Sequence, residues 1–378
     1  MIFGILDRYI LKKYLMSFFF TVLLFTLIAV AIDFADKVDS YISEPVTMKE
    51  IIFDYTLKFI IHINSLLWPL FALISVIFFT SRMAFDSEII SILNAGISYR
   101  RLLRPYMVGA SIIAGLLMIA NHTIVPQGNK TRIDFEQTYV WKHQDKGKKE
   151  NIHMFIGPHT KIFIERFNQK DKVATGVKLE EYDGNRINYI LTAKRMKWTG
   201  ESDKTKNAKD SLDNSPPANW QLNGYVARTI DGEKEYLNVG LRKKMDTLIN
   251  LTPKDFVQYL NAKEQMSTKE LKAAIDKEIK RGLGTPKKFE VEVFRRTSEP
   301  FSIIILTLIG VAVSARKVRG GMGLHLAIGI GLGALFVFVS KFSATFAFNS
   351  GFSAIYGVWL PNMVFLAIAI VLSIKAQM

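Results

Sequence analysis

Apolar runs long enough to cross a lipid bilayer lie near both ends of this chain, and they limit its possible folds more than any other feature. A spanning helix needs about 20 mainly apolar residues, because backbone groups in lipid must be satisfied within the segment. Three such runs come before Pro126 and three follow Glu299, so six transmembrane helices are predicted, and Pro126 is expected to stop the third. The runs are Leu15–Phe34, Leu57–Thr80, Leu102–Val125, Pro300–Ala315, Leu324–Phe348 and Gly357–Ile374.

The middle of the chain has a different pattern. Segments such as Lys161–Phe167 and Ile187–Trp198 alternate apolar and polar residues, and Asn223-Gly224 and Asp231-Gly232 are turn signals. Alternation with such turns is typical of antiparallel β-hairpins. The expected fold is therefore an α-helical membrane protein of six spans with an inserted all-β domain. The expected domains are residues 1–126 and 299–378 in the membrane and 127–298 outside it, with a polar loop at 200–219 and short helices at Pro253–Lys263 and Ser267–Arg281.

Charges in the short connecting segments favour one orientation. Cytoplasmic loops of membrane proteins carry an excess of Lys and Arg. If both termini are cytoplasmic, the inside segments are basic, whereas the first outside loop is acidic and Asn349–Tyr356 is uncharged. The insert then lies outside the cytoplasm, which is the periplasm if this is the inner membrane of a bacterium with two membranes. The inside basic residues are Arg8, Lys12, Lys13, Arg82, Arg100, Arg101, Arg104, Arg316, Lys317, Arg319 and Lys375.

Composition and motifs argue against several functions. The formal net charge of +15 suits anionic partners, and lipid headgroups suit a chain with both ends in lipid better than nucleic acid does. Without cysteine there is no disulfide or thiolate chemistry. No phosphate-binding loop of the Walker type and no H-E-x-x-H pair occurs, and Gly329-Ile-Gly331-Leu-Gly333 is better explained by close helix packing. We therefore expect no catalysis, metal or cofactor in this chain.

A few charges fall within or near the apolar runs. Lys58 and His62 are four residues apart and so share a helix face, and Lys341 lies in the outer half of the fifth run. A charge in lipid costs roughly 3 kcal/mol or more, so such residues face a cavity, a partner or the interface. Two interpretations stay open: the lysines extend to the interface, or they line a cavity that receives an anionic, phosphorylated lipid.

The stretch Ser81–Pro105 separates the second and third runs and is too polar to span. Asp86 or Ser87 can cap a short helix, and Gly96 can end it. Its apolar stripe is formed by Ile89, Ile92 and Leu93, with the isolated Glu88 beside it. An interfacial helix is one interpretation. The isolated glutamate favours another, in which a cytoplasmic ATP-driven partner docks on this helix.

Four segments carry a resemblance to a known family. In these segments and in its overall layout the chain resembles the YjgP/YjgQ permeases of lipopolysaccharide export, the LptF/LptG family, and its first and third segments are more similar to the G subunit. The segments are Gly4–Ile10 (GILDRYI), Ser87–Ser98 (SEIISILNAGIS), Val125–Gly128 (VPQG) and Phe289–Ser302 (FEVEVFRRTSEPFS).

The resemblance implies a mechanism. Such a permease pairs with a sister permease subunit and binds a cytoplasmic ATPase dimer, and ATP hydrolysis drives lipopolysaccharide from the inner membrane through a periplasmic β-jellyroll to a bridge protein that leads to the outer membrane. The coupling glutamate of the family matches Glu88, in a coupling helix near residues 84–97 with Asp86, Ile89 and Ile92 beside it.

The ligand contacts of the family are not carried over to this chain, because Asp33 stands where the G subunit has a lysine. Lys37, Lys58, Arg132 and Lys341 are therefore candidate anionic-lipid contacts from charge and position alone. Two other functions stay open: a permease of another lipid or lipoprotein ABC exporter, and a non-transporting membrane scaffold with a periplasmic sensing domain. A secondary transporter has no use for so large an insert.

Overall fold

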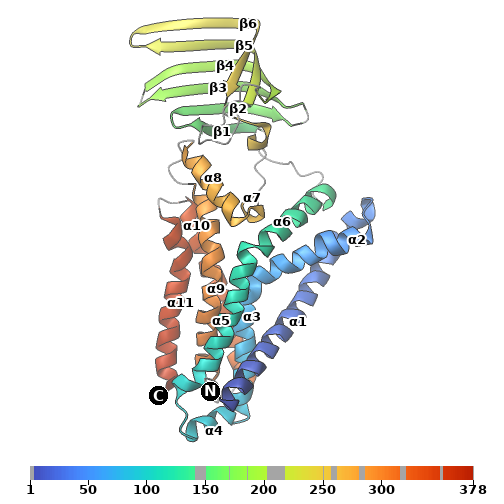
Figure 1. The fold of residues 1–378 in the computed structure, drawn as a ribbon, viewed down its shortest axis with the longest axis vertical. Helices are drawn as coiled ribbons and strands as arrows, with labels where there is room; N and C mark the ends of the chain where they lie inside the picture. Colours follow the sequence, from blue (N-terminus) through green and yellow to red (C-terminus); the bar gives the residue numbers. More distant parts are fainter. Residues whose placement is uncertain are drawn as a thin grey trace. The chain divides into compact units, whose positions relative to one another are not determined.

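The computed structural model describes residues 4–140, 150–169, 171–184, 186–201, 218–249, 251–256, 262–280, 286–315, 321–349 and 352–377. The chain divides into two compact units (Figure 1). The helical unit comprises Met1–Trp141, Lys263–Lys272 and Lys287–Met378, and the β unit comprises Lys142–Ala262 and Ala273–Pro286.

The helical unit contains the predicted spans. Six helices in the described part of the chain are long and apolar enough to cross a membrane, which confirms the expected helical membrane architecture. Each begins before its apolar run, and the second is continuous from α2 through η1 into α3. The spans are α1 (Ile5–Ser43), α2 (Met48–Glu50) with η1 (Ile51–Thr56) and α3 (Leu57–Phe85), α5 (Tyr99–His122), α9 (Lys287–Ser314), α10 (Gly321–Asn349) and α11 (Ala354–Gln377).

Helix α9 is the centre of the helical unit. It packs against α3, α5, α10 and α11. Of its most apolar stretch 67% is buried inside the unit, compared with 11% for α1 and 22% for α10. The two least buried spans therefore leave broad apolar faces for lipid or for another protein.

Glycines allow the central helices to approach closely. A Cβ on Gly310 of α9 would collide with Val76 of α3, and a Cβ on Gly329 of α10 would collide with Ile77 of α3. Gly333 lies in the same way against Leu70. Small residues at such crossings let helix backbones pack tightly in membranes. The glycine-rich stretch is thus a packing surface, as its position in an apolar run indicated.

Pro126 does not stop the third span. Helix α5 ends at His122, where Thr123 leaves helical geometry with φ −124° and ψ −62°. A new helix, α6 (Ile124–Phe135), follows with Pro126 in its first turn and continues into η2 (Glu136–Val140). A proline in the first turn loses no hydrogen bond, because the amides there have no partner within the helix. It begins α6 instead of ending α5.

The boundaries of the compact units consequently differ from the expected 126/127 and 298/299. Helix α6 packs against α3 and α5, and α9 begins at Lys287, so both belong with the membrane helices. The sequence pattern placed the boundary where the apolar runs end. The chain stays helical past those points because α6 still buries Val125, Ile133 and Phe135 against the helical unit.

The β unit is a six-stranded antiparallel sheet in which every strand pairs with its neighbour in sequence. Its core contains Trp220, whose indole N–H donates to the Leu251 carbonyl at 2.7 Å. This confirms the inserted all-β domain. The strands are β1 (Glu150–Gly157), β2 (Thr160–Asn168), β3 (Val173–Asp183), β4 (Arg186–Glu201), β5 (Ala218–Asp231) and β6 (Lys234–Ile249).

One of the two turn signals was misinterpreted. Asp231-Gly232 forms the turn between β5 and β6, with Gly232 at φ +60°. Asn223-Gly224 instead lies inside β5, where the register with β6 shifts and Gly224 has φ +66°. A left-handed glycine serves a β-bulge as well as a hairpin turn, so the dipeptide alone could not distinguish them. The predicted loop at 200–219 lies almost entirely outside the described residues.

Short helices lead back to the membrane spans. The predicted helix Pro253–Lys263 is in fact η4 (Pro253–Phe256) and α7 (Ala262–Gln265), with residues 257–261 outside the described part. The predicted helix at Ser267 is α8 (Thr268–Lys280), and its capping box is present: Ser267 N–H donates to Glu270 Oε2 at 2.7 Å.

Two glycines of α10 give a matched test of the close packing. Gly329→Val should destabilise the protein by about 1–3 kcal/mol, because the added carbons must enter the space that Ile77 fills. Gly331 has nothing within 4 Å of its Cβ position, so Gly331→Val is the control and should have little effect. Thermal unfolding of the detergent-solubilised variants measures both, and equal losses would contradict the packing explanation.

Candidate functional site

A short helix connects the second and third spans. α3 ends with Asp86 as its C-cap, Ser87 adopts a left-handed backbone with φ +62°, and α4 (Glu88–Asn94) follows. Gly96 at φ +85° ends the segment. Asp86 therefore closes α3 instead of opening α4. A left-handed conformation costs a non-glycine residue about 1–2 kcal/mol, so the packing of α4 must hold this sharp reversal in place.

That packing comes from the apolar stripe. Ile89 is 1% exposed and belongs to the same core as Ile10 and Tyr14 of α1. Ile92 is half-buried against this core. These side chains fix α4 to the spans. Leu93, the third member of the predicted stripe, is exposed at the edge of this face, and Ile90 is exposed beside it.

Glu88 lies at the border between the buried and exposed faces of α4. Its carboxylate accepts a hydrogen bond from the Tyr9 hydroxyl of α1 at 3.4 Å. Asp86 is exposed and lies 3.9 Å from Arg82. The surrounding arginines are also exposed, so a carboxylate and two apolar side chains lie within a basic surface. These arginines are Arg82, Arg100, Arg101 and Arg104.

Lys37 and Arg132, two of the candidate lipid contacts, lie together in a buried cluster of charges. Lys37 of α1 contacts Asp33 and the Tyr55 hydroxyl and lies 3.4 Å from Glu136 Oε1. Arg132 Nη1 donates to both carboxylate oxygens of Glu136 at 3.0 and 3.1 Å. The side chains of Lys37 and Arg132 are only 14% and 8% exposed.

The positive and negative charges of this cluster balance one another. Two cations face the carboxylates of Asp33 and Glu136, and the Tyr55 hydroxyl bridges those carboxylates at 3.0 and 3.2 Å. Burying ions is tolerated where they are paired and hydrogen-bonded. This gives Asp33 a role that the sequence did not reveal: it balances Lys37. The partners of Lys37 and Arg132 in this structure are thus within the chain itself.

The other two candidates have no ion pair among the described residues. Lys58 is half-buried on α3, and its Cδ lies 3.9 Å from the Cβ position of Gly128 on α6. His62, one turn further along α3, has a buried Nδ1 without a hydrogen-bond partner in the described chain. Lys341 is exposed on α10. Arg316, Lys317 and Arg319, which supported the predicted orientation, lie outside the described residues.

A second buried charge network was missed by sequence reasoning. On α9, Arg296 Nε lies 3.0 Å from Glu292, and Arg295 bridges Glu292 at 2.9 Å and Glu299 at 2.6 Å. The segment was noted only as part of a family motif. The spacing of acids and bases three and four residues apart was the available signal for side chains on one helix face.

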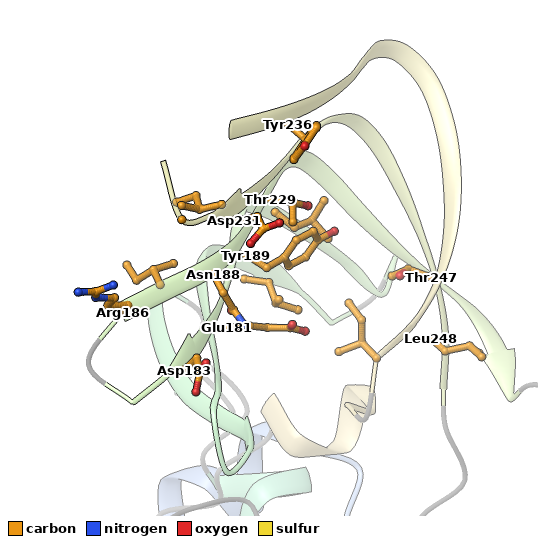
Figure 2. Close-up of a pocket in the computed structure, with 16 residues that line it drawn as sticks. Glu181, Asp183, Arg186, Asn188, Tyr189, Thr229, Asp231, Tyr236, Thr247 and Leu248 are labelled. Atoms are coloured by element: carbon orange, nitrogen blue, oxygen red, sulfur yellow. The ribbon is translucent and has the colours of Figure 1, made fainter. Parts of the chain in front are cut away.

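The β unit contains a cavity of about 1240 Å³ between strands β3 to β6 (Figure 2). Leu179, Leu191 and Ile249 supply apolar lining, and Asp183, Arg186 and Asp231 come from the strand ends. An apolar interior with a polar rim suits an amphipathic ligand. Within the described ranges, no three His, Asp or Glu side chains lie close enough together to hold a metal ion.

The sequence that contains these features matches a known protein family. The family model described as lipopolysaccharide export system permease LptF/LptG matches residues 8–375, nearly the whole chain. The match includes all six spans, the β unit and α4. A search of curated proteins gave no significant match.

The buried cluster around Glu136 should be essential for stability. Glu136→Gln leaves Arg132 and Lys37 without their shared carboxylate, so we expect a loss of about 3–5 kcal/mol in the free energy of unfolding. Glu150→Gln breaks the exposed pair with Arg166 and should cost under about 1 kcal/mol. Thermal unfolding in detergent measures both variants. A Glu136→Gln protein as stable as the control would show that the cluster contributes nothing.

Proposed function

The chain belongs to the family of lipopolysaccharide export system permeases LptF/LptG, and we propose that it is the permease subunit of an ABC transporter that extracts lipopolysaccharide from the inner membrane. The family match over residues 8–375 is the observation that carries this proposal. The family consists of permease components without catalysis of their own, so ATP hydrolysis belongs to a separate cytoplasmic ATPase dimer. The family model describes both subunits, so a G-like subunit stays a prediction.

The proposed docking surface for the ATPase is α4. Glu88 supplies a carboxylate at one edge of the buried face of α4, and Ile90 and Leu93 supply exposed apolar contacts at the other edge. Ile89 and Ile92 do not face the partner; they fix α4 to the spans through the buried core. Asp86 lies at the edge of the docking surface, beside Arg82. A helix that is rigidly attached to the spans can convert movement of the partner into movement of the membrane helices.

The proposed orientation places both termini and α4 in the cytoplasm and the β unit in the periplasm. The basic residues around α4 support it, because positive charge is concentrated on the cytoplasmic side of membrane proteins. The acidic side chains at the other end of α1 and in the loop after it, such as Asp36 and Asp39, agree with this direction.

The proposed path for lipopolysaccharide begins between this chain and a sister permease. The exposed apolar faces of α1 and α10 are available for that partner and for lipid. Acyl chains would next enter the cavity of the β unit. β6 is an edge strand with exposed Leu237, Val239 and Leu241, and a periplasmic bridge protein of jellyroll type could extend the sheet there.

Replacing Glu88 tests the coupling role. Glu88→Ala should weaken binding of the ATPase by about tenfold or more, or uncouple ATP hydrolysis from lipopolysaccharide release, because a charged contact of the docking surface is lost. Co-purification of the ATPase and release of lipopolysaccharide from proteoliposomes are the measurements. Glu233→Ala, at an exposed turn of the β unit, is the control. Normal binding together with normal release in Glu88→Ala would refute the docking role.

The absence of native cysteine makes the orientation directly testable. Ser91→Cys on α4 should react with a membrane-impermeant maleimide only after cells are lysed. Glu233→Cys, in the turn between β5 and β6, should react in cells whose outer membrane alone has been permeabilised. Both side chains belong to exposed residues, so accessibility depends on the side of the membrane. The reverse labelling pattern would show that the proposed orientation is wrong.

A further inference from the structure

Prolines interrupt two neighbouring spans of the helical unit. Pro300 lies inside α9 and Pro361 lies inside α11, and these two helices pack against each other (Figure 1). A proline within a helix has no N–H for the carbonyl four residues before it, and its ring pushes against that carbonyl. The freed carbonyls are those of Arg296 in α9 and Gly357 in α11. Helices kink at such points, and in a membrane the freed carbonyls need other donors.

Each freed carbonyl accepts a hydrogen bond from a neighbouring helix. Asn121 Nδ2 of α5 donates to the Arg296 carbonyl at 3.5 Å. Ser343 Oγ of α10 donates to the Gly357 carbonyl at 2.5 Å. Asn121 and Ser343 are only 3% and 7% exposed, so both hydrogen bonds lie inside the protein. The missing hydrogen bonds at the two prolines are therefore replaced by bonds from outside their own helices.

A third hydrogen bond joins the two proline sites directly. Asn362, the residue after Pro361, donates from Nδ2 to the Ser298 carbonyl of α9 at 2.8 Å, close to Pro300. Both Asn362 and Ser298 are buried. A single amide hydrogen bond contributes only modestly to stability. This bond can therefore favour one arrangement of α9 and α11 without making another inaccessible.

The apolar core of the helical unit is divided at the level of the prolines. A small cluster contains Val291 of α9, Ala347 of α10 and Val358 of α11. The main core begins on the other side of the prolines, at Ile303 in α9 and Phe365 in α11. The chain segments on the side of the small cluster thus have an apolar core of their own. These segments, named here the small bundle, are residues 287–299, 344–348 and 354–360.

The small bundle is tightly packed within itself, whereas its border with the main core is polar. A Cβ on Gly357 of α11 would lie 2.3 Å from the Ala347 Cβ of α10, so these helices are in close contact. Packed cores respond to a force by moving as rigid parts, and polar side chains between them can exchange hydrogen-bond partners. The buried polar side chains at the border are Asn121, Ser298, Ser302, Ser343 and Asn362.

We propose that Pro300 and Pro361 form a paired hinge about which the small bundle moves as one body, and that Asn121 and Asn362 hold it in the arrangement that the structure shows. A hinge consists of a few positions that absorb a change of backbone geometry between two rigid parts. The small bundle and the main core are these parts. The two amides are bonds between them that can break without disturbing either core.

The hinge itself is independent of the proposed function, but its role in transport rests on that function. During transport, the ends of α9, α10 and α11 in the small bundle must make room for a lipid while the rest of the helical unit stays packed. A hinge at Pro300 and Pro361 permits this movement, because it confines the backbone change to two positions that already lack helical hydrogen bonds.

Spin labels on the full-length chain in nanodiscs test the hinge, and the absence of native cysteine removes any background. Tyr356 of the small bundle and Ile370 of the remaining part of α11 are both exposed, as is Ile112 of α5. The outer pair is Ile112→Cys with Tyr356→Cys, and the inner pair is Ile112→Cys with Ile370→Cys. Double electron–electron resonance measures both distance distributions. The outer pair should give the broader distribution, because only this pair spans the hinge.

Two kinds of substitution should change the outer-pair distribution in opposite directions. Asn362→Leu removes a bond that holds the small bundle, so the distribution should broaden or shift by a few ångströms. Pro300→Ala combined with Pro361→Ala restores both missing amides, so the helices become continuous and the distribution should narrow. Pro69→Ala, at a proline inside α3, is the control and should leave it unchanged. The inner-pair distribution should be the same in all variants.

Release of lipopolysaccharide from proteoliposomes that also contain the ATPase tests the role in transport. The double proline variant should hydrolyse ATP normally and release lipopolysaccharide severalfold more slowly, because its small bundle cannot move. Normal release together with a narrowed distribution would show that transport does not use the hinge. If the unchanged chain releases no lipopolysaccharide, the proposed function and this role are both refuted, and the distances alone decide whether the hinge exists.

Two results would overturn the hinge. Equal widths for the outer and inner pairs, with no change in Asn362→Leu, would show that α9 and α11 are rigid at their prolines. A broader outer-pair distribution in both Asn362→Leu and the double proline variant would show that these residues only support packing. An unchanged inner-pair distribution and an unchanged unfolding temperature establish that each variant is folded.

Discussion

Charges inside the helical unit have to be compensated, and this requirement determines which helix ends are joined there. An isolated ion in a low-dielectric interior is far more costly than in water, whereas a paired and hydrogen-bonded one is tolerated. Lys37 on α1 therefore reaches Glu136 beyond the end of α6, and Arg132 completes the group. On α9, Glu292 and Glu299 compensate Arg295 and Arg296 in the same way. The first network joins η2 and α6 to α1, whereas the second lies within α9 and reaches α7 through the hydrogen bond from Arg296 Nη2 to the Lys263 carbonyl.

The features predicted from sequence were those that local composition determines. The six spans and the inserted β unit follow from runs and alternation within a few tens of residues, and both are confirmed. The cluster around Glu136 escaped prediction because its partners are remote: Lys37 and Glu136 are 99 positions apart. The α9 network is local, and its spacing of three and four residues could have predicted it. Pro126 and Asn223-Gly224 were misinterpreted for a different reason. Each suits two local structures, and the packing of α6 and the register of β5 with β6 decided between them.

Helix α4 shows how the residues of one predicted apolar stripe can differ in burial. Its spacing predicted an apolar face formed by Ile89, Ile92 and Leu93. Ile89 and Ile92 pack into the core shared with Ile10 and Tyr14, whereas Leu93 is exposed. The surface available to a partner is consequently formed by Glu88, Ile90 and Leu93. Tyr9 of α1 also donates to Glu88, so this carboxylate is linked directly to the first span.

The same rule of compensation separates the basic residues that are structural from those available to a ligand. Lys37, Arg132, Arg295 and Arg296 each have a carboxylate of this chain within ion-pair distance. Lys58, Lys263 and Lys341 have none among the described residues. Of these seven residues, the three arginines have internal partners, and their planar, bidentate geometry suits permanent pairs. The three without a partner are lysines, which attract phosphate as flexible point charges. A transport protein must release the ligand that it binds. Contacts from lysines, which require little fixed geometry, therefore suit a transported ligand better than the bidentate contacts of an arginine do.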